Sequence, residues 1–381
     1  MTASPDPIRF HVAHTPAKAA SYVLEALEAN ENVNGTFTQR CSSLIEERFG
    51  VPKVLITHSA TAALEVSAML LAAERGAGKV FMPSFTFSST ANAYLRAGYE
   101  LEFVDIDPAT MSPGTAEFAA AAPPRGSVVV PVHYAGNPGD IDEIEAWANT
   151  GGILVAEDGA QSFGSALGGR WAGTFGPVAA ISFHYTKNVH SSMGGALFIN
   201  DAGLVDTATY MWERGTNRQA LLKGLVDKYS WVTLGSSFQS TEIQAALLLA
   251  GLEEYDEILA RRRVLWEGYA ARLGDLEGSG LHIQSWRPEA VNNFHAFFVR
   301  LESAEAADSL RETLLERAIQ AYIGYVPLHN SPYGTERRLD RPLPLTEKWA
   351  ACVLRLPLHT AMDLAAMERV SGEVLAWLDR R

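Results

Sequence analysis

Short apolar runs alternate with longer amphipathic segments between about residues 50 and 200. This alternation is typical of strand and helix units that build a parallel sheet. In an open sheet of this kind, ligands bind at the carboxyl ends of the strands, so chemistry should be sought just after each run. The pattern predicts strands at residues 53–57, 79–82, 100–105, 127–132, 153–157, 179–183 and 196–200, and helices at residues 60–73, 89–97, 141–150 and 241–267.

The pattern changes after about residue 270. We expect strands at residues 293–301 and 320–325, a helix at residues 304–317, an irregular segment at residues 327–342 and a closing helix from Leu364. A chain of 381 residues exceeds the size at which one core keeps growing. We therefore predict an α/β fold with a mostly parallel central sheet and a smaller α+β C-terminal domain. The expected division is residues 1–250 and 251–381, joined by a long helix.

Composition narrows the function classes. The formal net charge of −13 argues against a nucleic-acid partner. Two cysteines, Cys41 and Cys352, are too few for a disulfide framework or a structural zinc site, and we expect no metal. The N-terminus lacks the basic and apolar regions of a signal peptide, and no apolar run approaches the roughly 18 residues of a membrane span. We expect a cytoplasmic protein without a membrane partner.

Lys187 is the first candidate for chemistry. It follows the apolar run at residues 178–181 and precedes Gly194-Gly195, where the next strand is predicted to start. A lysine attacks carbonyl groups only when burial or a neighbouring cation disfavours its charged form. Taken alone, such a lysine is more often a solvated loop residue, so its neighbours must decide.

Asp158 comes directly after another predicted strand, in Glu157-Asp158-Gly159-Ala160-Gln161. An aspartate at this position could hold a protonated ring nitrogen, and Gln161 offers both a donor and an acceptor. The alternative is an aspartate that caps a turn. Glu157 should point to the opposite face of the sheet, since side chains alternate along a strand.

Two further segments add a phosphate site and an aromatic face. Ser59 and Thr61 open a predicted helix, where free N–H groups and the helix dipole attract anions, although plain N-capping is the simpler interpretation. Phe87 follows the next strand and could stack on a planar ring or pack in the core. A phosphate site, an aromatic face, an acid and a lysine together describe a pocket for pyridoxal 5′-phosphate (PLP).

The order of these segments resembles the sugar aminotransferases of the DegT/DnrJ/EryC1/StrS family, which have the aspartate aminotransferase fold, PLP fold type I. The resemblance covers nearly the whole chain. It is carried by His58-Ser59-Ala60-Thr61-Ala62, Pro83-Ser84-Phe85-Thr86-Phe87, Pro131-Val132-His133-Tyr134-Ala135-Gly136, Glu157-Asp158-Gly159-Ala160-Gln161, Ser182-Phe183-His184-Tyr185-Thr186-Lys187-Asn188 and Glu242-Ile243-Gln244-Ala245-Ala246.

The resemblance implies roles for these residues. Lys187 would form the Schiff base and move the proton, while Asp158 would keep the pyridine nitrogen protonated. Gln161 would bond the phenolic oxygen of the cofactor. The phosphate would be held by Thr61, the backbone of Ala62 and Ser182, with Phe87 stacked on the ring.

The resemblance also implies a homodimer with active sites shared between subunits. The partner would complete the phosphate site from the segment before Glu242, where this chain has Ser237 and Gln239 in place of the asparagine that family members commonly have.

Residues 214–231 are similar to the branch that aminates dTDP-4-oxo-6-deoxyglucose at C4. Lys223, Lys228 and Trp231 are candidates for binding the nucleotide sugar, the alternative being solvated lysines and a packed tryptophan. His329 belongs to the Pro-Leu-His block of that branch. This chain has Gly324-Tyr325 where a His-Tyr pair is usual, and this difference bears on the orientation of the sugar.

The hypothesis from sequence is a PLP-dependent transaminase. Glutamate would convert the cofactor to pyridoxamine phosphate, which would aminate a dTDP-linked 4-keto-6-deoxy sugar. The alternatives are a 3-keto-sugar aminotransferase of the same family and a non-catalytic regulatory protein that binds PLP. Family dehydratases replace the lysine with histidine, so Lys187 disfavours them. The sequence does not determine the configuration at the aminated carbon or the nucleotide carrier.

Overall fold

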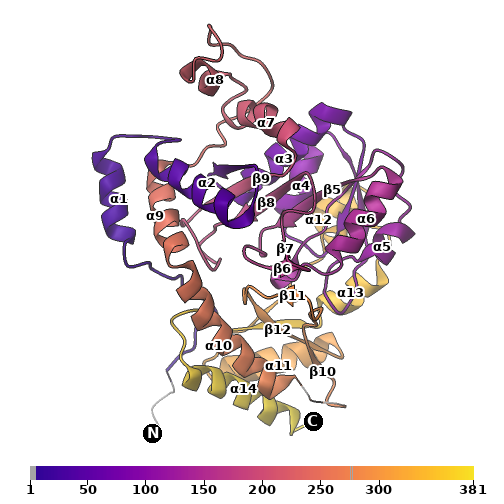
Figure 1. Ribbon diagram of the computed structural model, residues 1–381. Coiled ribbons are helices and arrows are strands. Elements are labelled where there is room, and N and C mark those ends of the chain that lie inside the picture. The colour runs from indigo at the N-terminus through magenta and orange to yellow at the C-terminus, as the bar shows by residue number, and fades with distance from the viewer. Residues whose placement is uncertain (1–5, 275, 277) are drawn as a thin grey trace.

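The computed structural model describes residues 6–274, 276 and 278–381. Its centre is a seven-stranded sheet in the order β1-β9-β8-β5-β4-β2-β3 (Figure 1). The strands from β8 to β3 are parallel, and β9 runs antiparallel to both of its neighbours. The mostly parallel sheet predicted from the sequence is therefore confirmed. The strands are β1 Lys53–Thr57, β2 Lys79–Pro83, β3 Glu100–Val104, β4 Val128–Val129, β5 Leu154–Gly159, β8 Val178–Ser182 and β9 Gly195–Ile199.

Both faces of this sheet are buried because successive side chains along a strand enter different cores. In β1, Leu55 packs against α3, α4 and α7, whereas Val54 and Ile56 pack against α2 and α9. Helices therefore cover the sheet on two sides, as Figure 1 shows. The helices of this part are α1 Ala19–Glu28, α2 Thr36–Phe49, α3 Ala60–Arg75, α4 Ser88–Arg96, α5 Thr115–Ala120, α6 Ile141–Gly151, α7 Val205–Trp212, α8 Arg218–Leu222 and α9 Glu242–Glu253.

A second, antiparallel sheet follows α10, in the order β10-β12-β14-β13. Its apolar face packs against α10, α11 and α14 in a separate core. The elements are α10 Tyr255–Leu273, β10 Leu281–Ile283, β12 Phe297–Leu301, α11 Ala304–Glu316, β13 Tyr322–Ile323, α12 Pro332–Glu336, α13 Pro344–Ala350, β14 Val353–Leu356 and α14 Leu364–Leu378. A small sheet of β6 Ala166–Leu167, β7 Arg170–Trp171 and β11 Ala290–Val291 lies between the two. The division at residue 250 stays a prediction.

The prediction of a single helix at residues 241–267 is wrong in one respect. The helix is interrupted at Glu254, where φ is −96° and ψ is 7°. The carboxylate of Glu254 accepts hydrogen bonds from the N–H of Ala17 and from His14 Nε2, so the N-terminal segment is tied to the break. The predicted strand at residues 127–132 is also shorter, because only Val128 and Val129 form the ladder.

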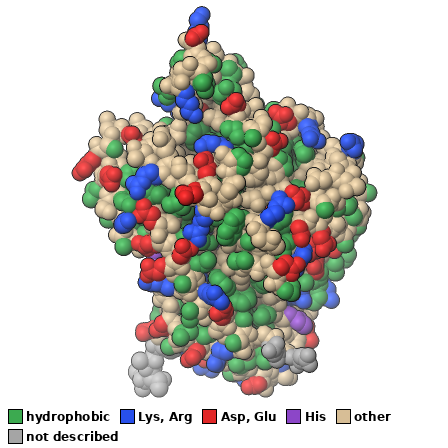
Figure 2. Space-filling view, viewed as in Figure 1, with side chains coloured by type: hydrophobic (Ala, Val, Ile, Leu, Met, Phe, Trp, Pro, Cys, Tyr) green, Lys and Arg blue, Asp and Glu red, His purple; other side chains and the backbone are tan. Residues whose placement is uncertain are grey.

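Residues 213–238, which we call the arm, carry α8 and project from the body at the top of Figure 1. Large apolar side chains of the arm are exposed to solvent, and Figure 2 shows apolar and basic side chains together on this projection. The exposed apolar residues are Leu222, Leu225, Tyr229, Trp231, Val232 and Leu234. Within the described ranges, no helix is both long and apolar enough to cross a lipid bilayer.

Candidate active site

A cavity of about 370 Å³ lies where β5 and β8 end and α3 and α4 begin. This is the position at which an open α/β sheet binds its ligands. Two larger hollows, of about 580 and 610 Å³, lie beside the arm and contain none of the predicted site residues except Lys223. The lining of the first cavity includes Ser59, Thr61, Phe87, Ser89, Thr90, Asp158, Ser182, His184, Lys187 and Tyr325.

Lys187 lies in the loop that turns the chain from β8 back into β9. The loop is closed by hydrogen bonds from the N–H of Lys187 to His184 O and from the N–H of Tyr185 to Ser192 O, both 2.8 Å long. Burial lowers the pKa of the Lys187 ammonium to about 8, against the opposing attraction of Asp158. The structure thus supplies the condition for nucleophilic chemistry that the sequence left open.

Asp158 is buried at the end of β5 with its carboxylate on the cavity. Its Oδ2 accepts a 2.6 Å hydrogen bond from Thr90 Oγ1, and its Oδ1 accepts one of 3.1 Å from the N–H of Ala160. These donors hold the carboxylate in one orientation. It can therefore receive a cationic N–H inside the cavity.

Glu157 points away from the cavity, which confirms the alternation predicted for this strand. Its carboxylate accepts hydrogen bonds from His133 Nε2 and from the N–H groups of Gly173, Phe175 and Gly176, at 2.7 to 2.9 Å. Both His133 and Glu157 are almost wholly buried. This carboxylate organises the chain after β7 and faces no ligand.

The start of α3 forms the opposite end of the cavity. Ser59 Oγ caps the helix by accepting a 3.1 Å hydrogen bond from the N–H of Ala62. The Ala62 N–H, which the resemblance assigns to the phosphate, therefore already has a partner. The N–H groups of Ala60 and Thr61 precede it and have no hydrogen bond within the described part of the chain. Thr61 Oγ1 lies 2.8 Å from Ser89 Oγ. Hydroxyl and N–H donors therefore converge here, as an anion requires.

Close packing brings β9 against this helix start. A Cβ added to Gly195 would lie 2.5 Å from the nitrogen of Ala60, so only glycine allows the approach. Ser182, the last residue of β8, lines the cavity beside it. The hydroxyl of Ser182 accepts a 3.3 Å hydrogen bond from the N–H of His184.

Two aromatic rings border the cavity. Phe87 is 59% exposed at the start of α4, and its ring centroid lies 6.4 Å from that of Tyr325. The hydroxyl of Tyr325 accepts a 2.9 Å hydrogen bond from Gln161 Nε2, and Gln161 Oε1 accepts one of 2.8 Å from the N–H of Ala135. Gln161 and Tyr325, predicted for cofactor and sugar respectively, are thus coupled to each other.

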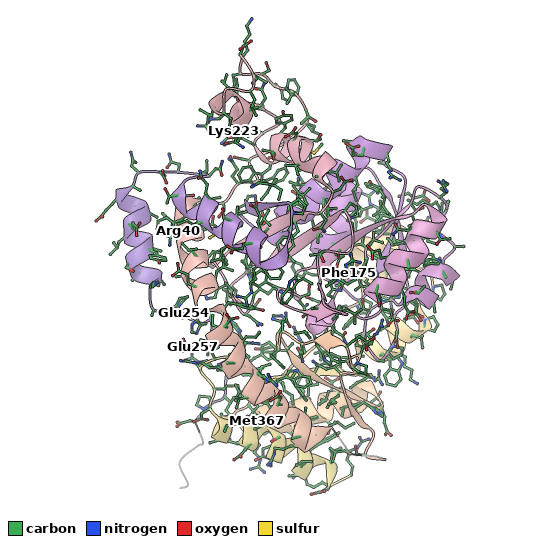
Figure 3. All side chains as sticks on the ribbon, in the orientation of Figure 1. Arg40, Phe175, Lys223, Glu254, Glu257 and Met367 are labelled. Atoms are coloured by element: carbon green, nitrogen blue, oxygen red, sulfur yellow. The ribbon has the colours of Figure 1, made fainter. Side chains whose placement is uncertain are left out.

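Other predicted residues lie apart from this cavity. Lys223, Lys228, Trp231 and Ser237 belong to the arm, and Figure 3 places Lys223 beside α8. Trp231 is 79% exposed. Gln239, just after the arm, is buried and accepts a 3.3 Å hydrogen bond from Arg214.

His329 is fully buried away from the cavity lining. Its Nδ1 lies 2.7 Å from Ser84 Oγ, and its Nε2 lies 3.3 Å from Glu347. These contacts join the end of β2 to α13. In this structure His329 is positioned to support the fold rather than to touch a ligand in the cavity.

Sequence reasoning missed Thr90 and His184. Thr90 sits in the hydroxyl-rich start of α4, Ser88-Ser89-Thr90, and that run of hydroxyls before a helix was the available signal. His184 lines the cavity three residues before Lys187, with Nδ1 3.0 Å from Thr186 Oγ1. Burial, and then the charge of Lys187, lower the pKa of His184.

The donor set fits PLP. An anion site lies at one end of the cavity, a buried carboxylate and a lysine of lowered pKa face it, and an aromatic ring borders it. The two-sided α/β sheet and this site define an aminotransferase of PLP fold type I.

The chain belongs to the DegT/DnrJ/EryC1/StrS aminotransferase family, whose model matches residues 15–375. Members of this family are PLP-dependent sugar aminotransferases, and the chain is an enzyme of that class.

Solved structures agree with this assignment. The aminotransferase TlmJ from Streptoalloteichus hindustanus is 27% identical, with a TM-score of 0.87 over 98% of this chain and 99% of that one. The sugar aminotransferase CalS13 from Micromonospora echinospora is 22% identical, with a TM-score of 0.88 over 97% and 99%. PseC from Helicobacter pylori, an aminotransferase involved in the biosynthesis of pseudoaminic acid, is 20% identical, with a TM-score of 0.89 over 99% and 100%. Because CalS13 and PseC have such low sequence identity to this chain, their similarity shows the fold alone.

Proposed function

We propose that this enzyme transfers the amino group of glutamate to C4 of a dTDP-linked 4-keto-6-deoxy sugar. The observation that carries the transaminase chemistry is that Lys187, with a pKa near 8, and the buried carboxylate of Asp158 face the same cavity. The 4-keto, dTDP-linked substrate is supported by the similarity of residues 214–231 to the branch that aminates such sugars.

Each of the cavity residues has a separate role toward the cofactor. Bound PLP supplies an aldehyde that accepts the amino group and a ring that withdraws electrons from the reacting carbon. Asp158 would receive the ring N–H, and the start of α3 with Thr61 and Ser182 would hold the phosphate. Phe87 would stack on the ring. Lys187 is the base of the site because a substantial fraction of its amine is neutral near pH 8.

We further propose a homodimer in which the arm completes the partner's cavity. Among the described residues, Lys187 is the only lysine or arginine that lines the cavity, so a phosphate there lacks a cation of its own. The arm presents Lys223, Lys228 and the exposed Trp231, a combination suited to a diphosphate and a base. Ser237 and Gln239 would complete the phosphate site in the same manner.

One experiment tests the substrate assignment. The protein is incubated with PLP, glutamate and dTDP-4-keto-6-deoxyglucose, and the product is analysed by NMR. An amine on C4 is expected, and the ring coupling constants give its configuration. Turnover with 3-keto nucleotide sugars alone would favour the related 3-aminotransferase. PLP retention without turnover on any keto sugar would favour a regulatory protein.

A further inference from the structure

Asn188, the residue that follows Lys187, is held by the segment that precedes β12. The side chain of Asn188 is buried. Its Nδ2 donates a 2.7 Å hydrogen bond to the carbonyl of Asn293, and its Oδ1 lies 3.3 Å from His295 Nδ1. A carbonyl oxygen only accepts, so Nδ2 must face Asn293 and Oδ1 must face His295. The Nδ1 atom of His295 therefore carries the hydrogen and donates it to Asn188.

The same segment holds the turn that follows β5. Asn293 is buried, and its Nδ2 donates to the carbonyls of Gln161 and Phe163, at 2.8 and 3.1 Å. Gln161 lies in this turn three residues after Asp158. Asn293 thus links the loop of Lys187 to the turn that carries the proposed ring contacts.

The segment is fixed from a third side by α10. Arg262 is buried, and its guanidinium donates to the carbonyls of Phe294 and His295. The N–H of Phe294 donates a 2.6 Å hydrogen bond to Asn292 Oδ1, and φ of Phe294 is +53°, in the left-handed region that bulky residues rarely adopt. Because these contacts hold the strained residue in place, the segment gives Asn188 a fixed support.

A small hollow lies between Lys187 and this segment. It has about 10 Å³ of room, and its lining includes Ser182, Lys187, Asn188, Asn293 and His295. This is about enough for one water and too little for the end of a lysine side chain. Lys187 and Ser182 also line the larger cavity. The lysine can therefore extend into the larger cavity, but it cannot turn back toward Asn293 and His295.

The reaction of an amine with an aldehyde held in the same site depends steeply on their spacing. Correct placement is worth several powers of ten, and a displacement of about 1 Å can cost about 100-fold in rate. The pairing of β5 with β8 fixes the strand ends that precede Asp158 and Lys187. The hydrogen bonds from Asn188 to Asn293 and from Asn293 to Gln161 extend this fixed spacing into the loops beyond the strands.

We propose that Asn188 and His295 are positioning residues of Lys187, and that the hydrogen bonds joining them to each other and to Asn293 direct the amine toward the aldehyde of the bound cofactor. This inference rests on the role proposed for Lys187. Neither Asn188 nor His295 lines the larger cavity. Their substitution should therefore slow bond formation without changing the affinity for the ring.

The test measures how fast the cofactor-free protein captures PLP. At about pH 9.5 Lys187, with a pKa of about 8, is mostly neutral. With saturating PLP, the first-order rate constant from absorbance reports bond formation after binding. We expect Asn188→Ala and His295→Leu to lower this rate constant about 10- to 100-fold.

Two more variants complete the series. His295→Asn should stay within about threefold of the wild type, because its amide nitrogen can replace Nδ1 as the donor to Asn188. Burial, followed by the charge of Lys187, keeps the pKa of His295 well below its usual value, so these substitutions remove no charge. His282→Leu, at an exposed position of β10, is the matched control and should have no effect.

Two measurements separate positioning from other effects. The affinity for 4-deoxypyridoxine phosphate, which has the ring and the phosphate but no aldehyde, should stay within about twofold of the wild type. Labelling of Lys187 by propionaldehyde and cyanoborohydride, read from peptide masses, should be unchanged, because the ring contacts do not hold this aldehyde. Unchanged PLP capture, an equal loss with propionaldehyde, or a loss confined to the affinity for the analogue would overturn the proposal.

The outcomes for Lys187 and for its neighbours are distinct. Capture of PLP by the wild type at a different lysine would refute the role of Lys187. Normal capture at Lys187 in every variant would refute only the roles of Asn188 and His295. Circular dichroism checks folding. If Asn188→Ala and His295→Leu do not fold, His295→Asn decides: a wild-type rate supports the hydrogen bond to Asn188, and slowing of about tenfold or more refutes it.

Discussion

Thr90 Oγ1 donates a 2.6 Å hydrogen bond to Asp158 Oδ2, and this bond joins the first turn of α4 to the carboxyl end of β5. Thr90 is itself held by Thr86, whose Oγ1 lies 3.1 Å away. The two threonines and the aspartate are buried. The orientation of the Asp158 carboxylate is therefore determined jointly by a neighbouring helix and by the N–H of Ala160, which follows its own strand.

Asp158→Asn should lower kcat about 100- to 1,000-fold, because a preorganised charge opposite the cofactor ring is removed. Thr90→Val keeps the charge but loses one hydrogen bond to it, so it should destabilise the protein by about 2 kcal/mol and weaken PLP binding. Steady-state kinetics, urea unfolding and PLP titration measure these effects. Full activity in Asp158→Asn would remove Asp158 from its proposed role.

Lys187→Ala should abolish multiple turnover, with a loss of at least about 100-fold, because both the nucleophile and the base of the site are deleted. The variant should remain folded, since the side chain makes no ion pair within the described residues. Product formation is followed by chromatography and folding by circular dichroism. Repeated turnover in this variant would show that another group carries the chemistry.

The lowered pKa of Lys187 predicts a pH dependence for PLP capture by the cofactor-free protein. Only the neutral amine reacts, and with a pKa of about 8 the capture rate should rise about fivefold between pH 7 and 8 and level off above pH 9. The same shift affects stability: the folded state binds fewer protons than the unfolded chain between about pH 8 and 10.5, so the Lys187 contribution rises with pH in that window. Stopped-flow absorbance across this range gives the midpoint. A rate still rising steeply at pH 10 would mean that burial does not lower this pKa.

Glu157→Gln should destabilise the fold by about 2 to 4 kcal/mol, because the buried carboxylate accepts hydrogen bonds from His133 and three backbone N–H groups. Glu316→Gln, on the exposed side of α11, is the control and should be neutral. Urea denaturation measures both. Since Glu157 faces away from the cavity, the affinity of the folded variant for PLP should stay close to that of the wild type. A specific loss of PLP binding without loss of stability would contradict the assignment of Glu157 to the fold and of Asp158 to the cofactor.

Mixed dimers test whether the arm serves the partner's cavity. Lys187→Ala lacks the reactive lysine, and the triple variant K223A/K228A/W231A lacks the proposed sugar contacts. If sites are shared, refolding the two together should restore roughly a quarter of wild-type activity, because half of the dimers contain one complete site. Sedimentation confirms the dimers. No recovery in confirmed mixed dimers would mean that each cavity uses only its own chain.

The cavity residues that the sequence pattern identified come at or just after the ends of strands. Asp158 and Lys187 each come directly after an apolar run, and parallel strands bring their carboxyl ends to the same edge of a sheet. Thr61 and Phe87 were found by the same rule at the starts of α3 and α4. His329 and Ala62 were named from the resemblance, and in the structure each has a hydrogen-bond partner that holds it in the framework.

The sequence by itself determined the α/β order and the mostly parallel sheet, and it placed Lys187 and Asp158 after strands of that sheet, because apolar periodicity and strand ends are local properties of the chain. Only the tertiary structure decided what surrounds them. The pKa of Lys187 depends on burial by distant segments, and the hydrogen bond from Thr90 crosses 68 positions. Such contacts depend on how separate elements pack, and no local pattern encodes them.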